Sequence, residues 1–319
     1  MTTPAIRTAE LRKRFGSRTA VHDLELVVEP GTVFGLIGPN GAGKTTTLRM
    51  LLDIIRPTSG TARVLGVDPR AGGAALRRRI GFIPGELRLE GRVKGRALLR
   101  HYAGISGPVE PGTIDSLAER LGLDLSRPVR SLSKGNKQKL GLVQAFMHRP
   151  ELLVLDEPTS GLDPLVQREF LTMVREARDN GQTVLLSSHV LSEIQQAADA
   201  VAVLSQGRVV AKGPVASLRL AGIRRIRAGL TRTTEQAVSV GLSRLGVDDL
   251  DVHTVGDVVR VTATIGGDID GVVKELARHQ IVDLAVEEPD LEESVLSLYG
   301  DSRENPTPRV TDAERADRA

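Results

Sequence analysis

The sequence predicts an α/β protein whose main sheet is parallel and covered by helices on both faces. An apolar run at 32–37 precedes a glycine-rich stretch and then a helical pattern at 45–54. A second apolar run at 152–155 is followed by a helical pattern at 165–178 and a third run at 183–187. Near-continuous apolar strands that alternate with helices are typical of parallel sheets buried on both faces.

The segments between these runs add further strands and helices. Residues 5–28 show the alternation of strands and lead into a turn at Pro30-Gly31. Periodicity predicts most of 94–147 as helical, with breaks at Gly107-Pro108 and Arg127-Pro128. We also expect a strand at 60–67, a basic helix at 74–79, a strand at 80–83 and a helix at 136–147.

The composition changes near Gly222, and a second domain is predicted from there. The expected order is β-α-β-β-α-β, which is the order of a ferredoxin-like unit. A capping box from Thr233 to Gln236 is expected to open its first helix, and a Gly256-Asp257 turn joins its two middle strands. The expected elements are strands at 223–231, 250–255, 257–265 and 281–287 and helices at 233–245 and 269–279. A final helix is expected at 291–298.

These patterns predict three parts of the chain. Residues 1–221 form the large α/β domain, and residues 222–300 form a small α+β domain. The tail at 301–319 is charged and almost free of apolar residues, so we expect it to be disordered.

The composition limits the function classes that this 319-residue chain can serve. Aromatic residues make up 2% of the chain and tryptophan is absent, which disfavours a stacking platform for single-stranded nucleic acid. A net charge of +3 is too small to indicate nucleic-acid binding, and the short basic run at 77–79 is typical of a solvated helix face. No cysteine is present for disulfides or thiolate metal sites.

The sequence also bears on membrane association. Residues 1–14 lack the apolar segment of a signal peptide. No apolar run approaches the ~20 residues that a membrane-spanning helix needs. We therefore expect any membrane role to depend on a partner chain.

The stretch from Gly38 to Thr46 has the composition and context of a phosphate-binding loop. Its glycines let successive backbone N–H groups face phosphate oxygens, and the following helix N-terminus adds partial positive charge. We expect Lys44 to reach the β- and γ-phosphates and the Thr45 hydroxyl to bind Mg²⁺. A chance glycine-rich turn is the alternative, which the flanking strand and helix disfavour. The residues expected to hold nucleotide here are Gly38, Pro39, Asn40, Gly41, Ala42, Gly43, Lys44, Thr45 and Thr46.

Two carboxylates, Asp156 and Glu157, end the apolar run at 152–155. A buried strand would deliver Asp156 to the phosphate end of the sheet, where it can hold the hydrated Mg²⁺. Glu157 would then be placed to orient and deprotonate an attacking water. The alternative is that both acids cap the next helix, and the upstream phosphate loop favours the catalytic interpretation.

Further motifs, in a fixed order, resemble those of ATP-binding cassette (ABC) transporters. Leu-Ser-Lys-Gly-Asn-Lys-Gln-Lys at 132–139 is similar to the signature motif of that family. Asp-Glu-Pro-Thr-Ser-Gly-Leu-Asp-Pro at 156–164 is similar to its Walker B and D-loop segments, and Ser-Ser-His at 187–189 to its switch histidine. The resemblance covers residues 1 to about 220. It implies an ABC cassette of the P-loop NTPase class, with a mixed core sheet, an antiparallel β subdomain and a helical subdomain at about 86–148.

The resemblance implies a nucleotide site that two subunits share. Two cassettes would pack head to tail around two ATP molecules, each bound by the phosphate loop of one subunit. Ser133 and the backbone N–H of Gly135 in the other subunit would meet the γ-phosphate. Asp163 would communicate between the two sites, and Phe15 would stack on adenine unless it packs between strands.

The catalytic roles of three residues also follow from the resemblance. Glu157 would be the general base. His189 would contact the γ-phosphate and sense hydrolysis, with Lys44 completing the catalytic group.

This chain departs from the family pattern at three positions. Gly85 stands where the family has a glutamine that reaches Mg²⁺ or water, and we expect Glu86 to substitute as the metal ligand. Lys134 replaces the first glycine of the signature, and its ammonium either approaches the phosphates of the other subunit or points to solvent. Asn136 replaces a glutamine and keeps an amide.

The function that the resemblance implies is ATP hydrolysis coupled to transport. The expected partners are a separately encoded transmembrane permease and a second copy of the ATPase subunit, with no direct nucleic-acid partner. The expected location is the cytoplasmic face of the cell membrane, peripheral through the permease. The α+β domain, followed by Glu-Pro-Asp-Leu-Glu-Glu at 288–293, resembles bacterial type-2 exporters of drugs, antibiotics or lipids.

Three alternatives remain within the same family. Soluble members that act on ribosomes or DNA carry two cassettes or a long coiled coil, whereas this chain shows one phosphate loop and no heptad run. Importer ATPases more often carry a β-rich extension, which the helix-containing second domain disfavours. The intact lysine, carboxylates and histidine named above argue against a cassette that does not hydrolyse ATP, and Gly85 keeps that alternative open.

Overall fold

The structure is a computed structural model that describes residues 3–218, 223–266 and 268–287. The chain forms two compact units, the first ending at Val215 and the second beginning at Ala216. The expected domain boundary at 221/222 lies outside the described residues, as do the expected final helix at 291–298 and the tail at 301–319.

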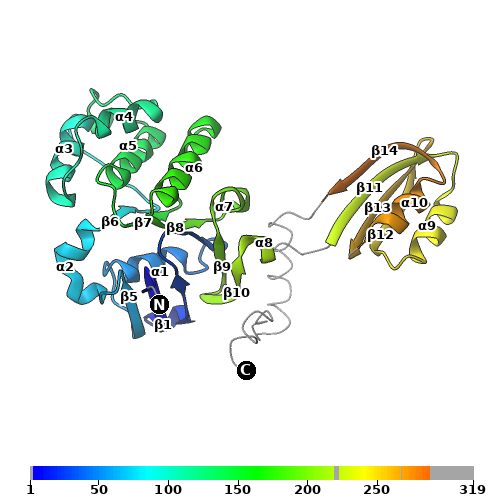
Figure 1. Cartoon of the computed structure of the whole chain (residues 1–319), viewed down its shortest axis with the longest axis horizontal. Coiled ribbons are helices and arrows are strands. Elements are labelled where there is room, and N and C mark those ends of the chain that lie inside the picture. Colours follow the sequence, from blue (N-terminus) through cyan, green and yellow to red (C-terminus); the bar gives the residue numbers. More distant parts are fainter. Residues whose placement is uncertain (1–2, 219–222, 267, 288–319) are drawn as a thin grey trace. The chain divides into compact units, whose positions relative to one another are not determined.

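The first unit is built on a mixed six-stranded sheet, which confirms the predicted fold class (Figure 1). Five of the strands are parallel, and the edge strand β10 is antiparallel to β9. Every residue of β4, β7 and β8 is buried, as near-continuous apolar runs predict. In spatial order the strands are β10 (Arg208–Pro214), β9 (Ala200–Ser205), β4 (Val33–Ile37), β8 (Thr183–Ser188), β7 (Leu152–Asp156) and β6 (Ile80–Ile83).

An antiparallel sheet forms the second layer of this unit. Helix α1 (Lys44–Leu51) contacts β7 of the core sheet and β2 and β5 of the antiparallel sheet, so it joins the two layers. The core between them includes Leu36, Leu48 and Leu51, all fully buried. The strands are β1 (Ile6–Phe15), β2 (Arg18–Leu24), β3 (Val27–Val28) and β5 (Ser59–Val64). They confirm the strands predicted in residues 5–28, and the strand predicted at 60–67 ends earlier, at Val64, before a turn at Leu65-Gly66.

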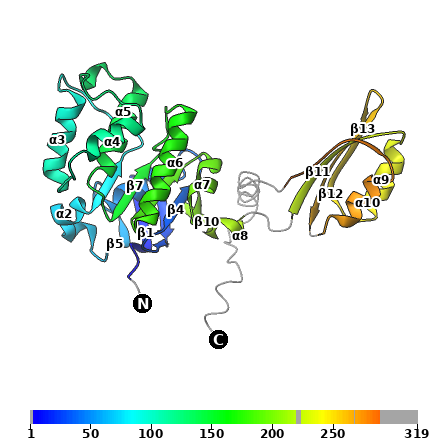
Figure 2. The same ribbon diagram turned by 45° about the horizontal axis from the view of Figure 1, so that its top comes forward.

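Helices form the remaining part of the first unit (Figure 2). Helix α3 ends at Ser106, before Gly107 with φ 137°, so the predicted break is confirmed. Two predicted starts were too late: α2 begins at Pro69 because Asp68 caps it, and α5 begins at Lys134 because Ser133 caps it. The helices are α2 (Pro69–Arg78), α3 (Gly95–Ser106), α4 (Thr113–Arg120), the 3₁₀ turn η1 (Val129–Ser131), α5 (Lys134–Phe146) and α6 (Pro164–Asp179).

The segment from 191 to 218 carries elements that the sequence patterns did not predict. Helix α7 (Leu191–Ala197) packs on β4 and β8 and covers the core sheet together with α6. Strands β9 and β10 extend that sheet, and α8 (Val215–Leu218) ends the segment. The described residues include no helix long and apolar enough to cross a membrane.

The second unit has the predicted β-α-β-β-α-β order and a four-stranded antiparallel sheet. Its spatial order, β12-β13-β11-β14, is that of a ferredoxin-like fold. The predicted helix cap was one residue early, because Thr234 accepts the backbone N–H of Ala237. The elements are β11 (Ile223–Thr231), α9 (Glu235–Ser243), β12 (Asp248–Val255), β13 (Val258–Gly266), α10 (Asp270–Leu276) and β14 (Gln280–Glu287).

Candidate functional site

The phosphate loop follows β4 and ends at Gly43, the residue before α1. A Cβ at Gly38 would lie 2.5 Å from the carbonyl oxygen of Leu204, and one at Gly43 would lie 2.8 Å from that of Ala20. Gly43 also has φ 106°, a conformation that favours glycine. These glycines therefore let the loop lie against its neighbours and turn directly into a helix N-terminus.

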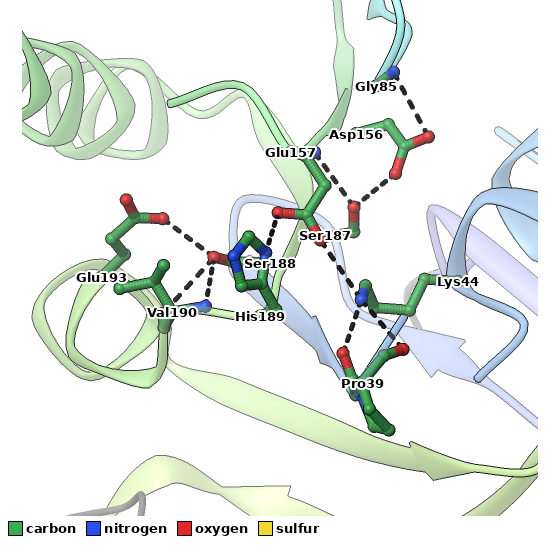
Figure 3. Close-up of polar contacts among 11 residues, drawn as sticks. Pro39, Lys44, Gly85, Asp156, Glu157, Ser187, Ser188, His189, Val190 and Glu193 are labelled. Carbon is green, nitrogen blue, oxygen red and sulfur yellow. Dashed lines mark hydrogen bonds and ion pairs between the residues drawn. The ribbon is translucent and has the colours of Figure 1, made fainter. Parts of the chain in front are cut away.

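Lys44 is the first residue of α1, and its side chain turns back over the loop (Figure 3). The residue is 5% exposed, and its Nζ donates to the carbonyl oxygens of Gly38 (2.5 Å) and Pro39 (3.4 Å). Nζ also lies 3.2 Å from Glu157 Oε1. That contact is an ion pair without hydrogen-bond geometry, so the buried Oε1 has no hydrogen-bond partner. A buried ammonium and a carboxylate oxygen with unused acceptor capacity thus face each other at the loop.

The two predicted carboxylates follow one another at the end of β7. Asp156 is 1% exposed; its Oδ1 accepts the Ser187 hydroxyl at 2.6 Å, and its Oδ2 accepts the backbone N–H of Gly85 at 3.3 Å. Glu157 donates its backbone N–H to Ser187 Oγ at 3.2 Å. Glu157 has φ 48°, a strained conformation for a residue with a side chain, and such strain costs about 1–3 kcal/mol.

His189 comes directly after β8, which lies beside β7 in the parallel register Asp156 to Ser187. Its Nδ1 lies 2.6 Å from Glu157 Oε2, and its side chain is 54% exposed (Figure 3). Lys44, Glu157 and His189 therefore form one contiguous group, with the carboxylate between the two basic side chains. The group opens to solvent on the His189 side.

The remaining predicted residues of the signature and D-loop form a second group. Ser133 caps α5 by accepting the N–H of Asn136, and Asp163 caps α6 by accepting two backbone N–H groups. A Cβ at Gly135 would lie 2.7 Å from the carbonyl oxygen of Gly161, so the two segments touch. Among the described residues, no hydrogen bond or ion pair joins Ser133, Gly135 or Asp163 to the Lys44 group.

Comparison with known proteins identifies the family of the chain. The family model described as "ABC transporter" matches residues 21–160. The bacitracin transport ATP-binding protein BcrA of Bacillus licheniformis is 34% identical, over 92% of this chain and 97% of that protein. The chain belongs to the ABC transporter ATP-binding proteins. It is an ATP-binding and ATP-hydrolysing cassette of the exporter-type group.

Two further comparisons differ in the share of the chain that they cover. The daunorubicin resistance ATP-binding protein DrrA3 of Streptomyces coeruleorubidus is 36% identical, over 95% of this chain and 98% of that protein. Because the first unit ends at Val215, this similarity reaches into the second unit. A solved ATP-binding subunit of an ABC transporter is 31% identical with a TM-score of 0.63, over 68% of this chain and 92% of that one.

Two of the departures from the family pattern, Gly85 and Lys134, have contacts that the structure describes, as does Glu86, the expected substitute ligand. Glu86 is exposed, and its Oε1 accepts hydrogen bonds from Nε (3.1 Å) and Nη2 (2.7 Å) of Arg88. It is the backbone N–H of Gly85 that contacts Asp156. The aliphatic stem of Lys134 lies over Gly161, at about ordinary van der Waals distance from an ideal Cβ there.

Phe15 ends β1 and is 50% exposed. The ammonium of Lys13 lies 4.9 Å from the centre of its ring. The strand that follows it, β2, carries the Ala20 carbonyl that lies close to Gly43 of the phosphate loop. Phe15 is therefore a half-exposed aromatic side chain with a lysine ammonium close to its ring.

The geometry adds two residues that the sequence analysis did not single out for a role. Ser187 holds both Asp156 and the backbone of Glu157, and Gln138 in α5 donates to the carbonyl oxygen of Pro158 at 2.9 Å. The feature that could have pointed to Ser187 is its position at the end of an apolar strand, where it pairs with Asp156 in the parallel sheet. The signal for Gln138 was a polar residue on a buried helix face.

Proposed function

We propose that this cassette powers an exporter whose membrane pathway is formed by a separate permease, and that the cargo is an antibiotic or a related drug-like compound. The relatives that support this are named for bacitracin transport and for daunorubicin resistance. Both are similar over more than nine-tenths of this chain, so the similarity includes the second unit as well as the ATPase. The cassette would lie at the cytoplasmic face of the membrane, held there by the permease.

The contiguous group of Lys44, Glu157 and His189 carries the catalytic part of the proposal. Lys44 neutralises the β- and γ-phosphates of ATP once its ammonium turns from the loop carbonyls toward them. Glu157 acts as the general base, because its carboxylate is aimed at the loop and Oε1 has no hydrogen-bond partner to give up. His189 holds Oε2 of that carboxylate and is open to solvent, where it can contact the γ-phosphate.

Mg²⁺ fits this site as an ion shared with the nucleotide. The donors are the Thr45 hydroxyl and the Asp156 carboxylate, and both are the oxygen ligands that Mg²⁺ prefers. The described residues contain no cluster of three acidic, histidine or cysteine side chains that could hold a metal alone. Mg²⁺ commonly binds through one or two carboxylates plus substrate phosphates. When bound, it would neutralise charge on the transferring phosphate.

A second cassette would complete the nucleotide site. Ser133 and the N–H of Gly135 lie at the start of α5, where a helix N-terminus favours the negative charge of a γ-phosphate from the other subunit. Asp163 caps the N-terminus of α6 and lies two residues after Gly161, which contacts Gly135, so Asp163 would connect the two sites. Phe15 would stack on adenine.

Glu86 is our proposed substitute for the missing glutamine as a metal ligand. A variant at this position tests whether Glu86 binds Mg²⁺ or is only an acidic side chain on the surface. To reach Mg²⁺, its side chain would have to leave Arg88. If it does so, Glu86→Ala lowers the ATPase rate and raises the Mg²⁺ concentration needed for half-maximal activity. An unchanged rate and an unchanged Mg²⁺ requirement would remove Glu86 from the site.

Steady-state ATPase and nucleotide affinity of the purified chain test the proposed catalytic group. We expect Glu157→Gln to lower kcat by about 10²–10⁴-fold, the range of general acid–base contributions, while the Kd for ATP stays within about threefold. The matched control is Glu151→Gln, which changes an exposed carboxylate that pairs with Arg79. Equal kcat values for the two variants would contradict the role of Glu157.

A further inference from the structure

One short segment, residues 84–87, follows β6 and contacts both Asp156 at the end of β7 and helix α5. The backbone N–H of Gly85 donates to Asp156 Oδ2 at 3.3 Å. A Cβ added at Gly85 would lie 3.0 Å from Oδ2 and 3.2 Å from Cγ of the same carboxylate, which is closer than nine in ten real Cβ contacts. The φ of Gly85 is not positive, so the glycine serves this close approach and not a special backbone conformation.

Two residues later, the same segment contacts the helix that begins with the signature motif. The side chain of Leu87 packs against Gly141 in α5, and a Cβ at Gly141 would lie 2.6 Å from Leu87 Cδ2. Gly141 is therefore a notch that receives Leu87. Since α5 starts directly after Ser133, this contact ties the segment to the helix that presents the signature residues.

We propose that Gly85 is a positioning residue for the metal-site carboxylate, and that the segment couples this carboxylate to α5 through Leu87. The inference rests on the proposed function, because it assigns Asp156 to Mg²⁺ and α5 to the second nucleotide site. A main-chain N–H is fixed in place by the strand that precedes it, whereas a glutamine side chain would have several rotamers.

The close approach decides what a side chain at position 85 would do. Any residue other than glycine must move either its own backbone or the Asp156 carboxylate, because the Cβ is already in contact with Oδ2. Gly85→Gln would therefore disturb the carboxylate before its amide could reach a metal. Restoring the glutamine of the family pattern is expected to weaken the site and not to improve it.

The first test measures the binding of a fluorescent ATP analogue to the full chain, with Mg²⁺ and with EDTA. The quantity compared is the ratio of the two Kd values, which does not depend on the fraction of active protein. We expect Gly85→Ala and Gly85→Gln to reduce the Mg²⁺-dependent gain in affinity by about tenfold. The matched control is Gly104→Ala in α3, because a Cβ at that position has no neighbour within 4 Å. We expect this variant to have the same ratio of Kd values as the unmodified chain.

The outcomes separate this inference from the proposed function. If the unmodified chain and Gly104→Ala do not bind the analogue with Mg²⁺, the proposed function is wrong. If they bind it and Gly85→Ala has the same ratio, only the positioning role of Gly85 is wrong. A larger Mg²⁺-dependent gain in Gly85→Gln would show that the glycine is a lost ligand, which also overturns the inference.

A second variant tests the coupling without crowding the carboxylate. Leu87→Ala removes the group that fills the Gly141 notch and leaves Gly85 in place. In a Glu157→Gln background, we expect it to keep the Kd ratio within about twofold and to lower ATP-dependent dimerisation at least fivefold. Dimerisation equal to that of the Glu157→Gln parent would overturn the coupling through Leu87.

Discussion

Ser187→Ala gives a sharp test of how the carboxylates are held. The hydroxyl of Ser187 donates to Asp156 Oδ1 at 2.6 Å, and the two residues are 0% and 1% exposed. A buried hydrogen bond to a charged group contributes about 1.5–3 kcal/mol, so removing it should lower the free energy of unfolding of the first unit by about that amount. The backbone of Glu157 loses less, because its N–H also donates to the Ser187 carbonyl oxygen at 3.1 Å.

Ser188→Ala is the matched control for this variant. The Ser188 side chain is equally buried and its hydroxyl donates to Glu193 Oε2 at 2.9 Å, whereas the hydrogen bonds of the Asp156 carboxylate go to Ser187 and Gly85. Urea unfolding followed by circular dichroism should therefore show similar losses of stability for the two variants. Only Ser187→Ala should raise the Mg²⁺ concentration needed for half-maximal ATPase activity, by about tenfold, which corresponds to about 1.4 kcal/mol.

Two results would refute this reasoning. One is a loss of unfolding free energy below about 0.5 kcal/mol for Ser187→Ala, which is the range of ordinary surface substitutions. The other is the same Mg²⁺ requirement in Ser187→Ala and Ser188→Ala. Either result would mean that the 2.6 Å contact does not determine where the Asp156 carboxylate lies.

Three further predictions concern other parts of the first unit. His189→Ala should lower kcat by at least about 10²-fold with little change in the Kd for ATP. If the variant and the unmodified chain have equal kcat values, the 2.6 Å contact between His189 and Glu157 has no role in catalysis. Phe15→Ala should weaken ATP binding by about 1–3 kcal/mol while Phe15→Tyr should not, and calorimetry that finds equal Kd values would exclude stacking. Burial lowers the pKa of His148, whose ring nitrogens lack partners in hydrogen-bond geometry, although nearby backbone groups offset this in part. Below pH 6.5 the unfolded state therefore binds more protons than the folded state, so the melting temperature should fall as the pH drops below 6.5. The fall should be smaller in His148→Gln, which lacks the imidazole.

The phosphate loop and the two carboxylates were predictable because their signals are local. A glycine-rich stretch between a buried strand and a helix, and acids at the end of a second strand, need no knowledge of distant contacts. The pairing of Ser187 with Asp156 depends instead on the register of two strands that lie about thirty residues apart in the chain. No pattern within either strand contains that register.

The environment of Gly85 was harder to foresee for a related reason. The family resemblance showed that position 85 lacks the usual glutamine, and Glu86 was expected to replace it. In the structure Glu86 pairs with the neighbouring Arg88, and the backbone of Gly85 approaches Asp156. Sequence reasoning compares side chains, so a contact made by a main-chain N–H escapes it. Strand β9 was missed although its apolar run, Ala-Val-Ala-Val-Leu, is a local signal, whereas the short helix α7 is placed by its packing on β4 and β8.

The most direct test of the central claim is the mass of the Glu157→Gln variant in solution. The claim is that the phosphate loop of one chain is completed by Ser133 and Gly135 of another. Light scattering after size exclusion should show twice the 34.2 kDa mass of the chain with saturating ATP and Mg²⁺, and a single chain without nucleotide. Adding Ser133→Arg should return the nucleotide-bound protein to one chain. A Glu157→Gln variant that binds ATP and stays at 34.2 kDa would contradict the shared site.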